Sequence, residues 1–384
     1  MKKMSEKIRK IAVVIPKYGL VGGAEQYAFE LTKRIAAHPH YEVHVFANKW
    51  LDSSSNITFH KVPIIKFPRY LTTPSFAYFV KHKLSQMKFD IIHTHERIID
   101  ADVFTMHGIP HHIWVRDIRK KRMSLFDHAT HWVEKTLVTG NKRAKLLAVS
   151  NLAKEKFLEE YTVGGDRIEV IHPGVDIEKF QKYDTNICRR EVRRQFNIPL
   201  TDKIILFVGM NFEVKGLDKI MMALHRLKVK EPSQKITLLI VGKGNQHKYL
   251  KIAHNRGIVE NIVFTGVILK DQLVQIYLAS DMFTMLSQFD SFGMSVLEAM
   301  AASLPVVISC SVGARDLVRQ GVNGFIIDDT ADSDAIAHSM AAILDGERRN
   351  SMAKEACNTA ACQTWDVVAK KIENIYDYLQ YFTK

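Results

Sequence analysis

The sequence predicts an α/β fold built of two Rossmann-like domains, whose parallel sheets face each other across an inter-domain cleft. Short apolar runs rich in β-branched residues alternate with amphipathic stretches along almost the whole chain, which is typical of βαβ units. Many runs are apolar on both faces, as strands of a parallel sheet are when helices cover both sides. At 384 residues the chain also exceeds the size at which one hydrophobic core keeps growing, so we expect two domains.

The first domain is expected over residues 1–172. Its predicted strands are Ile11–Ile15, Tyr41–Phe46, Ile57–Val62, Asp90–Thr94, Lys145–Ser150 and Arg167–Ile171. Between the first two strands, residues 24–37 place apolar side chains at helical spacing, which predicts an amphipathic helix. The apolar face of that helix consists of Ala24, Tyr27, Ala28, Leu31 and Ile35.

The second domain is expected over residues 200–365. Its predicted strands are Ile204–Val208, Ile236–Val241, Asn261–Phe264, Met282–Leu286, Pro305–Ile308 and Gly324–Ile327. Residues 173–199 open with a Pro-Gly turn and continue as a charged helix, so we expect a linker there. Residues 366–384 form a Tyr-rich amphipathic helix without a strand of its own, and we expect this helix to cross back to the first domain.

Composition and charge narrow the class of protein. A hydrophobic content of 47% and a charged content of 25% match an ordinary soluble globular protein. No apolar run approaches the length of about 18 residues that a membrane-spanning helix needs. The net charge of +13 predicts an anionic partner, and because the chain carries no recognised nucleic-acid module, we expect a membrane surface and no nucleic acid. The four cysteines show no paired metal spacing, which fits a reducing cytoplasm.

The most informative window is D-S-F-G-M-S-V-L-E-A-M, from Asp290 to Met300. It places one carboxylate before a Gly-containing helix start and a second, Glu298, a little over two turns further on. A helix N-terminus offers free N–H groups and a partial positive charge, so it suits a phosphate. Carboxylates accept hydrogen bonds from sugar hydroxyls. The window therefore predicts a nucleotide-sugar site.

Glycine-containing turns follow strands in both predicted domains. G-L-V-G-G-A-E, from Gly19 to Glu25, permits backbone approach to an anion, although a plain strand–turn–helix explains it equally well. V-G-M-N-F-E-V-K-G, from Val208 to Gly216, puts Lys215 at the carboxyl end of a strand, where ligands of open α/β sheets bind. A third turn, I-V-G-K-G-N, begins at Ile240 and is expected to contact the nucleotide.

Four motifs in this order resemble those of the retaining glycosyltransferase family 4, which has the GT-B fold. They are G-G-A-E, A-V-S followed by I-H-P-G-V-D, V-G-x(5)-K-G, and a carboxylate followed after seven residues by Glu. The resemblance covers essentially the whole chain. Within the family, the chain is most similar to lipopolysaccharide core heptose glucosyltransferases, a likeness to which F-T-M-H-G-I-P, from Phe104 to Pro110, contributes.

The resemblance implies roles for individual residues in binding the donor. Glu298 would bind the ribose hydroxyls and Lys215 the pyrophosphate. The transferred sugar would be held by Asp290 and the backbone of Phe292, Gly293, Met294 and Ser295, with Gly22 and Gly23 completing the donor-binding set.

Two departures from the family pattern stand out. The first carboxylate is Asp290 rather than the usual Glu, which leaves the identity of the sugar open. Members of the family usually carry an Arg near the Lys, but the corresponding positions here are Met210 and Val214. Lys215 therefore acts alone or with Arg315 or Lys243.

In the first domain, the resemblance places His107 beside the transferred sugar, where it would hydrogen-bond near the C6 hydroxyl. Asp102 is a second candidate, which we expect to orient the acceptor hydroxyl. We count Asp290, His107 and Asp102 as the catalytic set.

No metal and no other cofactor is expected. His93 and His95 alternate on a strand, but no third ligand follows with zinc-like spacing. Asp-x-Asp, which holds a divalent cation in glycosyltransferases of the other major fold, occurs at Asp100 and Asp102 and recurs at 332–334, so the pattern arises by chance. A lysine and a helix N-terminus suffice to neutralise a diphosphate leaving group.

A stretch of cations and aromatics from His111 to Phe126 predicts a membrane-binding patch. Cations interleaved with aromatics suit the headgroup region of an anionic membrane. A solvated helix face over core aromatics is the alternative, and nucleic-acid binding is a weaker one. The predicted patch consists of Trp114, Arg116, Arg119, Lys120, Lys121 and Arg122.

Taken together, these features predict a retaining hexosyltransferase that moves a hexose, glucose in particular, from a UDP-sugar to a hydroxyl of a glycolipid or lipopolysaccharide-type acceptor. We expect it in the cytoplasm, peripherally bound to the inner face of the membrane. Two alternatives stay open: a nucleotide-sugar epimerase of the same fold, and a non-catalytic basic module that binds a membrane or nucleic acid. The sequence names neither the acceptor nor the oligomeric state.

Overall fold

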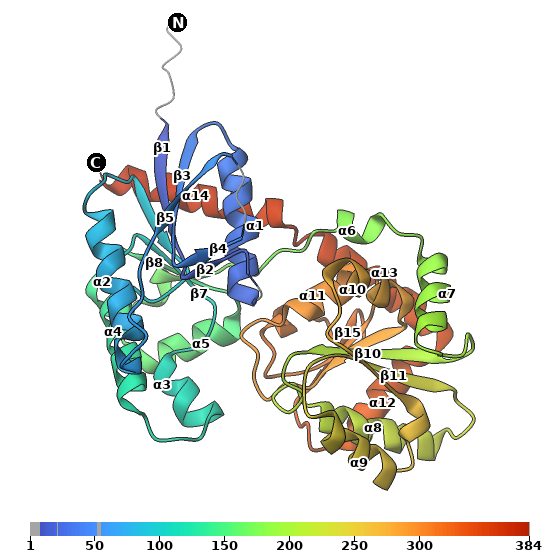
Figure 1. Cartoon of the computed structure of the whole chain (residues 1–384). Coiled ribbons are helices and arrows are strands. Elements are labelled where there is room, and N and C mark those ends of the chain that lie inside the picture. Colours follow the sequence, from blue (N-terminus) through green and yellow to red (C-terminus); the bar gives the residue numbers. More distant parts are fainter. Residues whose placement is uncertain (1–7, 21, 52–54, 384) are drawn as a thin grey trace, which may run out of the picture. The chain divides into compact units, whose positions relative to one another are not determined.

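The structure, a computed structural model, describes residues 8–20, 22–51 and 55–383 (Figure 1). The chain divides into two compact units. The first unit contains the chain up to Gly174 and returns for Trp365 onward, and the second unit spans Val175–Thr364. Each unit is a parallel sheet flanked by helices, so the α/β prediction is confirmed. Residues 1–7 and 384, which the predicted domain ranges include, lie outside the described residues.

The first unit is built on a seven-stranded parallel sheet in the order β5-β3-β1-β6-β7-β8-β9. Its strands are β1 (Arg9–Val14), β3 (Tyr41–Ala47), β5 (Ile57–Lys61), β6 (Ile91–Thr94), β7 (Val103–Met106), β8 (Lys145–Ala148) and β9 (Ile168–Val170). A short parallel pair, β2 (Lys17–Tyr18) with β4 (Lys49–Trp50), extends from the carboxyl ends of β1 and β3. The helices are α1 (Gly23–Ala37), α2 (Thr72–Leu84), α3 (His111–Ile113), α4 (Leu125–Gly140), α5 (Asn151–Glu160) and α14 (Trp365–Thr383).

The second unit holds a six-stranded parallel sheet in the order β12-β11-β10-β13-β14-β15. This is the doubly wound order whose strand sequence reverses beside the first strand, β10. The strands are β10 (Lys203–Gly209), β11 (Ile236–Gly242), β12 (Ile262–Gly266), β13 (Met282–Met285), β14 (Val306–Ser309) and β15 (Gly324–Ile327). The helices are α6 (Glu178–Gln181), α7 (Thr185–Gln195), α8 (Leu217–Lys230), α9 (Gln246–Asn255), α10 (Lys270–Ala279), α11 (Met294–Ala301), α12 (Ser333–Leu344) and α13 (Gly346–Ala361).

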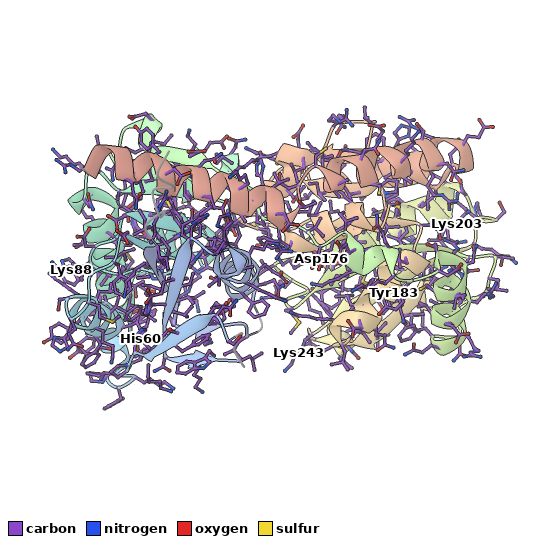
Figure 2. The ribbon with its side chains drawn as sticks, turned by 90° about the horizontal axis from the view of Figure 1, so that it is seen from above. His60, Lys88, Asp176, Tyr183, Lys203 and Lys243 are labelled. Atoms are coloured by element: carbon purple, nitrogen blue, oxygen red, sulfur yellow. The ribbon has the colours of Figure 1, made fainter. Side chains whose placement is uncertain are left out.

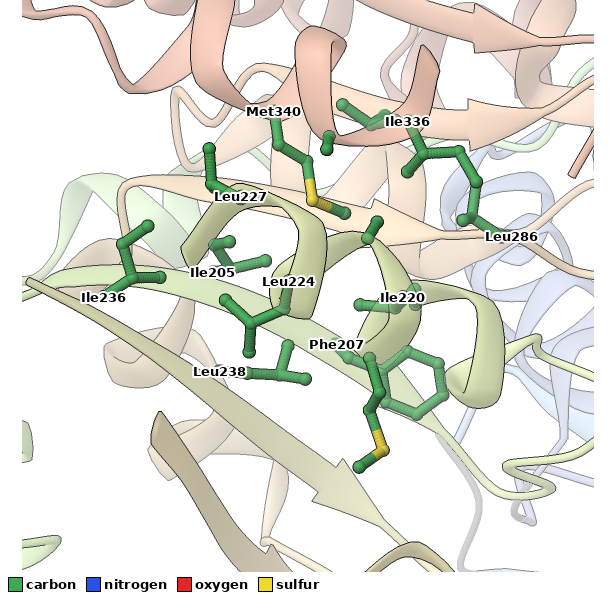
Figure 3. Packing of buried hydrophobic residues seen from close by; sticks show 14 of the residues in the cluster. Ile205, Phe207, Ile220, Leu224, Leu227, Ile236, Leu238, Leu286, Ile336 and Met340 are labelled. Atoms are coloured by element: carbon green, nitrogen blue, oxygen red, sulfur yellow. The ribbon is translucent and has the colours of Figure 1, made fainter. Parts of the chain in front are cut away.

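Apolar packing between helices and sheet fixes the second unit. Figure 3 shows Ile220 and Leu224 of α8 against Phe207 of β10 and its neighbours, with Met340 of α12 beside them. All four side chains are fully buried. Burying side chains of this size stabilises the fold by about 1.5–3 kcal/mol each before conformational entropy is counted. This rigid core holds the loops at the carboxyl ends of the strands in place.

The expected linker at 173–199 is instead part of the second unit. Arg193 of α7 is only 2% exposed, and its guanidinium donates to the Ala279 carbonyl at 2.8 Å and to Asp281 at 3.4 Å. Arg189 also pairs with Asp281, at 3.1 Å. A buried carboxylate needs such partners. The charged character of α7, from which we inferred a solvated connector, therefore serves to anchor it.

Helix α14 belongs to the first unit, although the residues of the second unit separate it in sequence from the rest of the first unit. Tyr376 Oη lies 2.6 Å from His93 Nδ1 of β6. Arg34 of α1 donates to Asp366 at 2.7 Å. The boundary predicted at 365–366 falls one residue later than the observed boundary, because Trp365 already packs edge-on against Tyr27 of α1.

Candidate functional site

Lys215 and Asp290 meet at the carboxyl edge of the second sheet. Lys215 lies in the loop after β10, and Asp290 lies in the loop after β13, the neighbouring strand. Their side chains form an ion pair and are 22% and 17% exposed. The other carboxylate oxygen of Asp290 accepts a hydrogen bond from the Phe292 amide at 3.3 Å. An accessible, well-held cation therefore stands at the sheet edge where ligands bind in this architecture.

Glycines bring two helix starts close to that ion pair. Gly216 precedes α8 with φ of 72°, and a Cβ on it would lie 2.0 Å from the Leu286 carbonyl oxygen. Gly293 precedes α11 with φ of 91°, where a Cβ would lie 2.8 Å from Met285 Cε. The positive φ favours glycine at both positions, and at Gly216 the backbone oxygen of Leu286 also leaves no room for a Cβ. No side chain caps the N-terminus of α11, which leaves its first-turn amides facing the site.

The other predicted donor-binding residues lie on the same loop and helix. Phe292 is 3% exposed, so it contributes through its backbone rather than through its ring. Met294 and Ser295 form the first turn of α11, and Ser295 Oγ lies 3.8 Å from the Met285 sulfur. The structure thus brings Lys215, Asp290 and residues 292–295 together in the second unit.

Glu298 is held by a tyrosine that the sequence reasoning missed. It lies in the second turn of α11, and its Oε2 accepts a hydrogen bond of 3.0 Å from Tyr277 Oη. Burial raises the pKa of the Glu298 carboxyl, and the Tyr277 hydrogen bond opposes that rise. Tyr277 stands 21 residues earlier on α10, so no local spacing in the sequence signals the pair.

The two candidate auxiliary cations differ in placement. Arg315 Nη1 donates to the Cys310 carbonyl at 2.9 Å, which holds the guanidinium at the carboxyl end of β14. Lys243 follows β11 and is exposed (Figure 2). Both lie on the strand-end edge of the same sheet as Lys215.

In the first unit, Gly22 and Gly23 begin α1. Gly22 has φ of 150°, and a Cβ there would lie 2.1 Å from Glu25 Oε2, because the Glu25 side chain folds back over the start of the helix. A Cβ on Gly23 would meet nothing within 4 Å. The Glu25 side chain can move away, so it is the φ of 150° that favours glycine at position 22, and no such constraint applies at Gly23.

His107 is half-buried and follows the carboxyl end of β7, where it ends a row of imidazoles whose other members, His93 and His95, are buried. His107 Nε2 lies 2.9 Å from His95 Nδ1, and the His93 and His95 rings stack with centroids 4.5 Å apart. The Tyr27 ring contacts His107 edge-on at 4.9 Å between centroids. Burial lowers the pKa of both His93 and His107 to about 3, and the pKa of His95 well below its usual value. His107 is therefore a neutral hydrogen-bonding group at physiological pH, as its predicted role requires.

These histidines make the first unit sensitive to acid. Between about pH 6.5 and about pH 3, these imidazoles are protonated in the unfolded chain but not in the folded chain. The free energy of unfolding therefore falls as the pH falls, by about 1 kcal/mol per pH unit for each such imidazole. We expect His95→Gln to reduce the slope of unfolding free energy against pH, measured by urea titration from pH 7 to pH 5. The exposed His82→Gln variant is the control, and an equal reduction in both would contradict the assignment.

Asp102 does not join His107. It precedes β7 at the amino edge of the sheet, whereas His107 follows the carboxyl end of the same strand. Its Oδ2 accepts a hydrogen bond of 2.8 Å from the Ile92 amide. Burial raises the pKa of this carboxyl. Asp102 thus ties two strand starts together at the edge of the sheet opposite His107, and its acceptor-orienting role stays a prediction.

The predicted membrane-binding patch lies on and after a π-helical turn, Trp114–Ile118. Trp114 is half-buried, whereas Lys120, Lys121 and Arg122 are exposed. Two of the cations are partly neutralised: Arg116 pairs with Asp117 and Glu159, and Arg119 Nη1 lies 3.0 Å from Asp127. The remaining cations border a hollow of about 710 Å³.

Within residues 8–20, 22–51 and 55–383, no group of His, Cys, Asp and Glu side chains is arranged to hold a metal ion. Among the helices that the structure describes, none combines the length and apolarity needed to cross a bilayer.

Comparison with known proteins agrees with this geometry. A family model described as glycosyl transferases group 1 matches residues 189–359, and one described as Glycosyltransferase Family 4 matches residues 21–179. The D-inositol 3-phosphate glycosyltransferase of Corynebacterium urealyticum is 30% identical over 318 residues, which cover 78% of this chain and 73% of that protein.

Solved structures share the fold over nearly the whole chain. WaaG, a glycosyltransferase involved in lipopolysaccharide biosynthesis, aligns with a TM-score of 0.78 at 19% identity, covering 95% of this chain and 99% of its own. Anabaena HepE in complex with UDP-glucose aligns with a TM-score of 0.71 at 18% identity, covering 96% and 100%.

The two parallel α/β units are those of a GT-B glycosyltransferase. The chain belongs to the group 1 glycosyltransferases, enzymes that transfer a sugar from a nucleotide sugar.

Proposed function

We propose that this protein transfers a hexose, glucose in particular, from a UDP-sugar to a hydroxyl of a glycolipid or lipopolysaccharide-type acceptor, with retention of configuration. The observation that carries the proposal is the Lys215–Asp290 ion pair beside the uncapped N-terminus of α11, the helix that also bears Glu298. A cation and first-turn amides suit a diphosphate, and the two carboxylates suit hydroxyls on either side of it.

In the proposed complex with the donor, each of these side chains binds a different part of the nucleotide sugar. Lys215 and the amides at the start of α11 neutralise the pyrophosphate, with Arg315 or Lys243 as an auxiliary cation. Glu298, kept in place by Tyr277, binds the ribose hydroxyls. Asp290, released from Lys215 when the diphosphate takes its place, accepts a hydrogen bond from the transferred sugar. HepE bound to UDP-glucose supports the choice of donor.

The proposed reaction proceeds by front-face attack. The bond from the anomeric carbon to the diphosphate oxygen breaks, the bond to the acceptor oxygen forms on the same face, and the acceptor proton passes to the departing phosphate. Charge on that phosphate develops beside Lys215, which therefore stabilises the transition state more than the ground state. His107, neutral because burial lowers its pKa to about 3, is proposed to hydrogen-bond the transferred hexose without exchanging a proton.

A screen of donors tests the proposal. We expect UDP-glucose to raise the thermal unfolding temperature of the unit that binds it more than GDP-sugars do, because a ligand at 100 times its Kd stabilises the folded state by about 2.7 kcal/mol. Equal shifts with every nucleotide sugar would contradict the donor assignment. An epimerase would convert the donor with no acceptor present, so incubation with UDP-glucose alone, followed by analysis of the sugar, separates the two activities.

We further propose that the exposed cations bind an anionic membrane at the inner, cytoplasmic face. Reversing Lys120, Lys121 and Arg122 to Glu is expected to reduce co-sedimentation with anionic vesicles to the level seen with neutral ones, since each cation near such a surface contributes about 1 kcal/mol. Arg119 is left intact because it pairs with buried Asp127.

The control reverses three exposed lysines elsewhere on the first unit: Lys81, Lys88 and Lys142 (Lys88 is labelled in Figure 2). Replacing these control lysines with Glu changes the net charge by the same amount as the patch variant does. A loss of vesicle binding that is as large in the control as in the patch variant would remove the patch assignment.

A further inference from the structure

The proposed reaction uses His107 but not the histidine to which it is hydrogen-bonded. His95 follows β6 and His107 follows β7, the neighbouring strand, so both stand at the carboxyl edge of the first sheet. His95 Nδ1 lies 2.9 Å from His107 Nε2, and the two ring planes differ by 22°. Since Nε2 is engaged with His95, a hexose hydrogen-bonds to the His107 ring through its other nitrogen, Nδ1.

The bond between the two rings exists in one of two forms. Burial lowers the pKa of both imidazoles, so each is neutral at physiological pH and carries one N–H and one bare nitrogen. In the first form, His95 donates from Nδ1 and His107 carries its own proton on Nδ1. In the second form, His107 donates from Nε2 and His95 carries its proton on Nε2. His107 is a donor toward the hexose in the first form and an acceptor in the second.

The surroundings of His95 Nε2 favour the first form. His95 Nε2 and Tyr27 Oη are both buried, and neither has a hydrogen-bond partner among the described residues. The Tyr27 ring packs on both imidazoles, with its centroid 5.8 Å from that of His95 and 4.9 Å from that of His107. Burial raises the pKa of Tyr27, so its hydroxyl keeps its proton.

The hydrogens of this cluster balance in only one of the forms. In the first form, the bare His95 Nε2 is an acceptor for the Tyr27 hydroxyl, through a small shift or one buried water. In the second form, His95 Nε2 and Tyr27 Oη each carry a hydrogen, and the hydroxyl oxygen is the one acceptor between them. A buried donor is then left without an acceptor, which proteins rarely tolerate.

The third imidazole of the row, His93, lies in a different environment. Its Nδ1 is 2.6 Å from Tyr376 Oη and its Nε2 is 2.7 Å from Thr105 Oγ1. Both partners are hydroxyls, which donate or accept, so either tautomer of His93 is satisfied. His93 therefore serves the packing of α14 on the sheet, and the Tyr376 hydroxyl offers a control for the Tyr27 hydroxyl within the same row.

We propose that His95 is a positioning residue for sugar transfer: it donates from Nδ1 to His107 Nε2, so that His107 keeps its proton on Nδ1 and donates a hydrogen bond to the C6 hydroxyl of the hexose. The Tyr27 hydroxyl, directed at His95 Nε2, fixes the tautomer of His95. This inference rests on the proposed function, because it assigns the direction of the hydrogen bond through which His107 holds the donor sugar.

Nitrogen-15 NMR of the histidine rings in the full-length protein tests the tautomers without any substrate. Correlations between ring nitrogens and carbon-bound ring protons distinguish a ring protonated on Nδ1 from one protonated on Nε2, and His95→Phe and His107→Phe assign the signals. We expect both rings to be protonated on Nδ1. In His95→Phe, His107 is expected to lose this tautomer, because no ring nitrogen remains to donate to its Nε2.

Calorimetric titration with UDP-glucose and UDP-6-deoxyglucose tests the consequence for the donor. The unaltered protein is expected to bind UDP-glucose about tenfold more tightly than the deoxy analogue, and His95→Phe is expected to bind the two within twofold. His95→Asn is expected to recover most of the preference, since its amide nitrogen stands as many bonds from Cα as Nδ1 does. Tyr27→Phe is expected to lose part of the preference, whereas Tyr376→Phe keeps it. UDP alone is expected to bind equally to all variants.

Two results would overturn the proposal: a His107 ring protonated on Nε2 in the unaltered protein, or a preference for UDP-glucose that survives in His95→Phe. Equal losses in Tyr27→Phe and Tyr376→Phe would show that packing of the row, and not the hydrogen bond to His95, sets the preference, and would overturn it as well. An unaltered protein that binds the two donors equally would instead contradict the proposed contact between His107 and the hexose, and the NMR measurement would still decide the role of His95.

Discussion

Glu298→Ala is expected to lower kcat/KM for UDP-sugar-dependent transfer by about 1000-fold while the protein stays folded. The loss corresponds to about 4 kcal/mol of transition-state stabilisation, within the range for a carboxylate that makes two hydrogen bonds to a buried substrate. Fold retention is expected because Glu298 is half-buried on the edge of α11 and its Tyr277 partner keeps its packing against Phe180 and Phe283. UDP release and circular dichroism measure the two effects.

Tyr277→Phe provides the matched control for Glu298. It removes the hydrogen bond of 3.0 Å to the carboxylate and leaves the aromatic packing in place. We expect a smaller loss, about tenfold and mostly in KM for the donor, because the carboxylate remains but is less well oriented. Turnover near the wild-type rate in the Glu298→Ala variant would contradict the ribose assignment.

Lys215→Met is expected to lower kcat by at least about 1000-fold, because the methionine fills a similar volume but leaves the departing diphosphate without its cation. The change also leaves Asp290 without its ion-pair partner. Single-turnover measurement with UDP-glucose at saturation separates this loss of kcat from weaker binding.

Lys219→Met is the control for Lys215, since Lys219 lies four residues further on, in the first turn of α8, and its side chain is 42% exposed. It is expected to retain the wild-type rate. Lys215→Arg keeps the charge and is expected to recover part of the activity. A Lys215→Met enzyme within threefold of wild type would show that another group neutralises the diphosphate.

Periodicity predicted most of the fold because parallel sheets keep their strands apolar on both faces. Twelve predicted strands coincide with strands of the two main sheets to within two residues at each end. The strand β7, Val103–Met106, was missed although F-T-M-H-G-I-P overlaps it, because it follows β6 without the intervening helix that an alternation of strands and helices leads one to expect. The linker prediction was wrong because composition cannot distinguish a solvated charged helix from one whose arginines are anchored on Asp281.

The site was predictable where its residues are adjacent in sequence. Asp290, the glycine before α11 and Glu298 lie in one window, and their relation follows from helical geometry. Tyr277 could not be found in this way, since its link to Glu298 depends on how α10 packs beside α11. Asp102 illustrates the opposite case, in which closeness in sequence does not give closeness in space. It lies close to His107 in sequence, but the four residues of β7 carry the chain from one edge of the sheet to the other.

The most direct test of the central assignment is a thermodynamic cycle between Glu298 and the ribose. UDP and 2′-deoxy-UDP are titrated into the wild type and into Glu298→Ala, with a chelator present so that metal binding does not contribute. The account predicts that the wild type binds UDP at least tenfold more tightly than its deoxy analogue and that this preference disappears in the variant. A preference that survives in Glu298→Ala, or a wild type that binds no UDP, would contradict it.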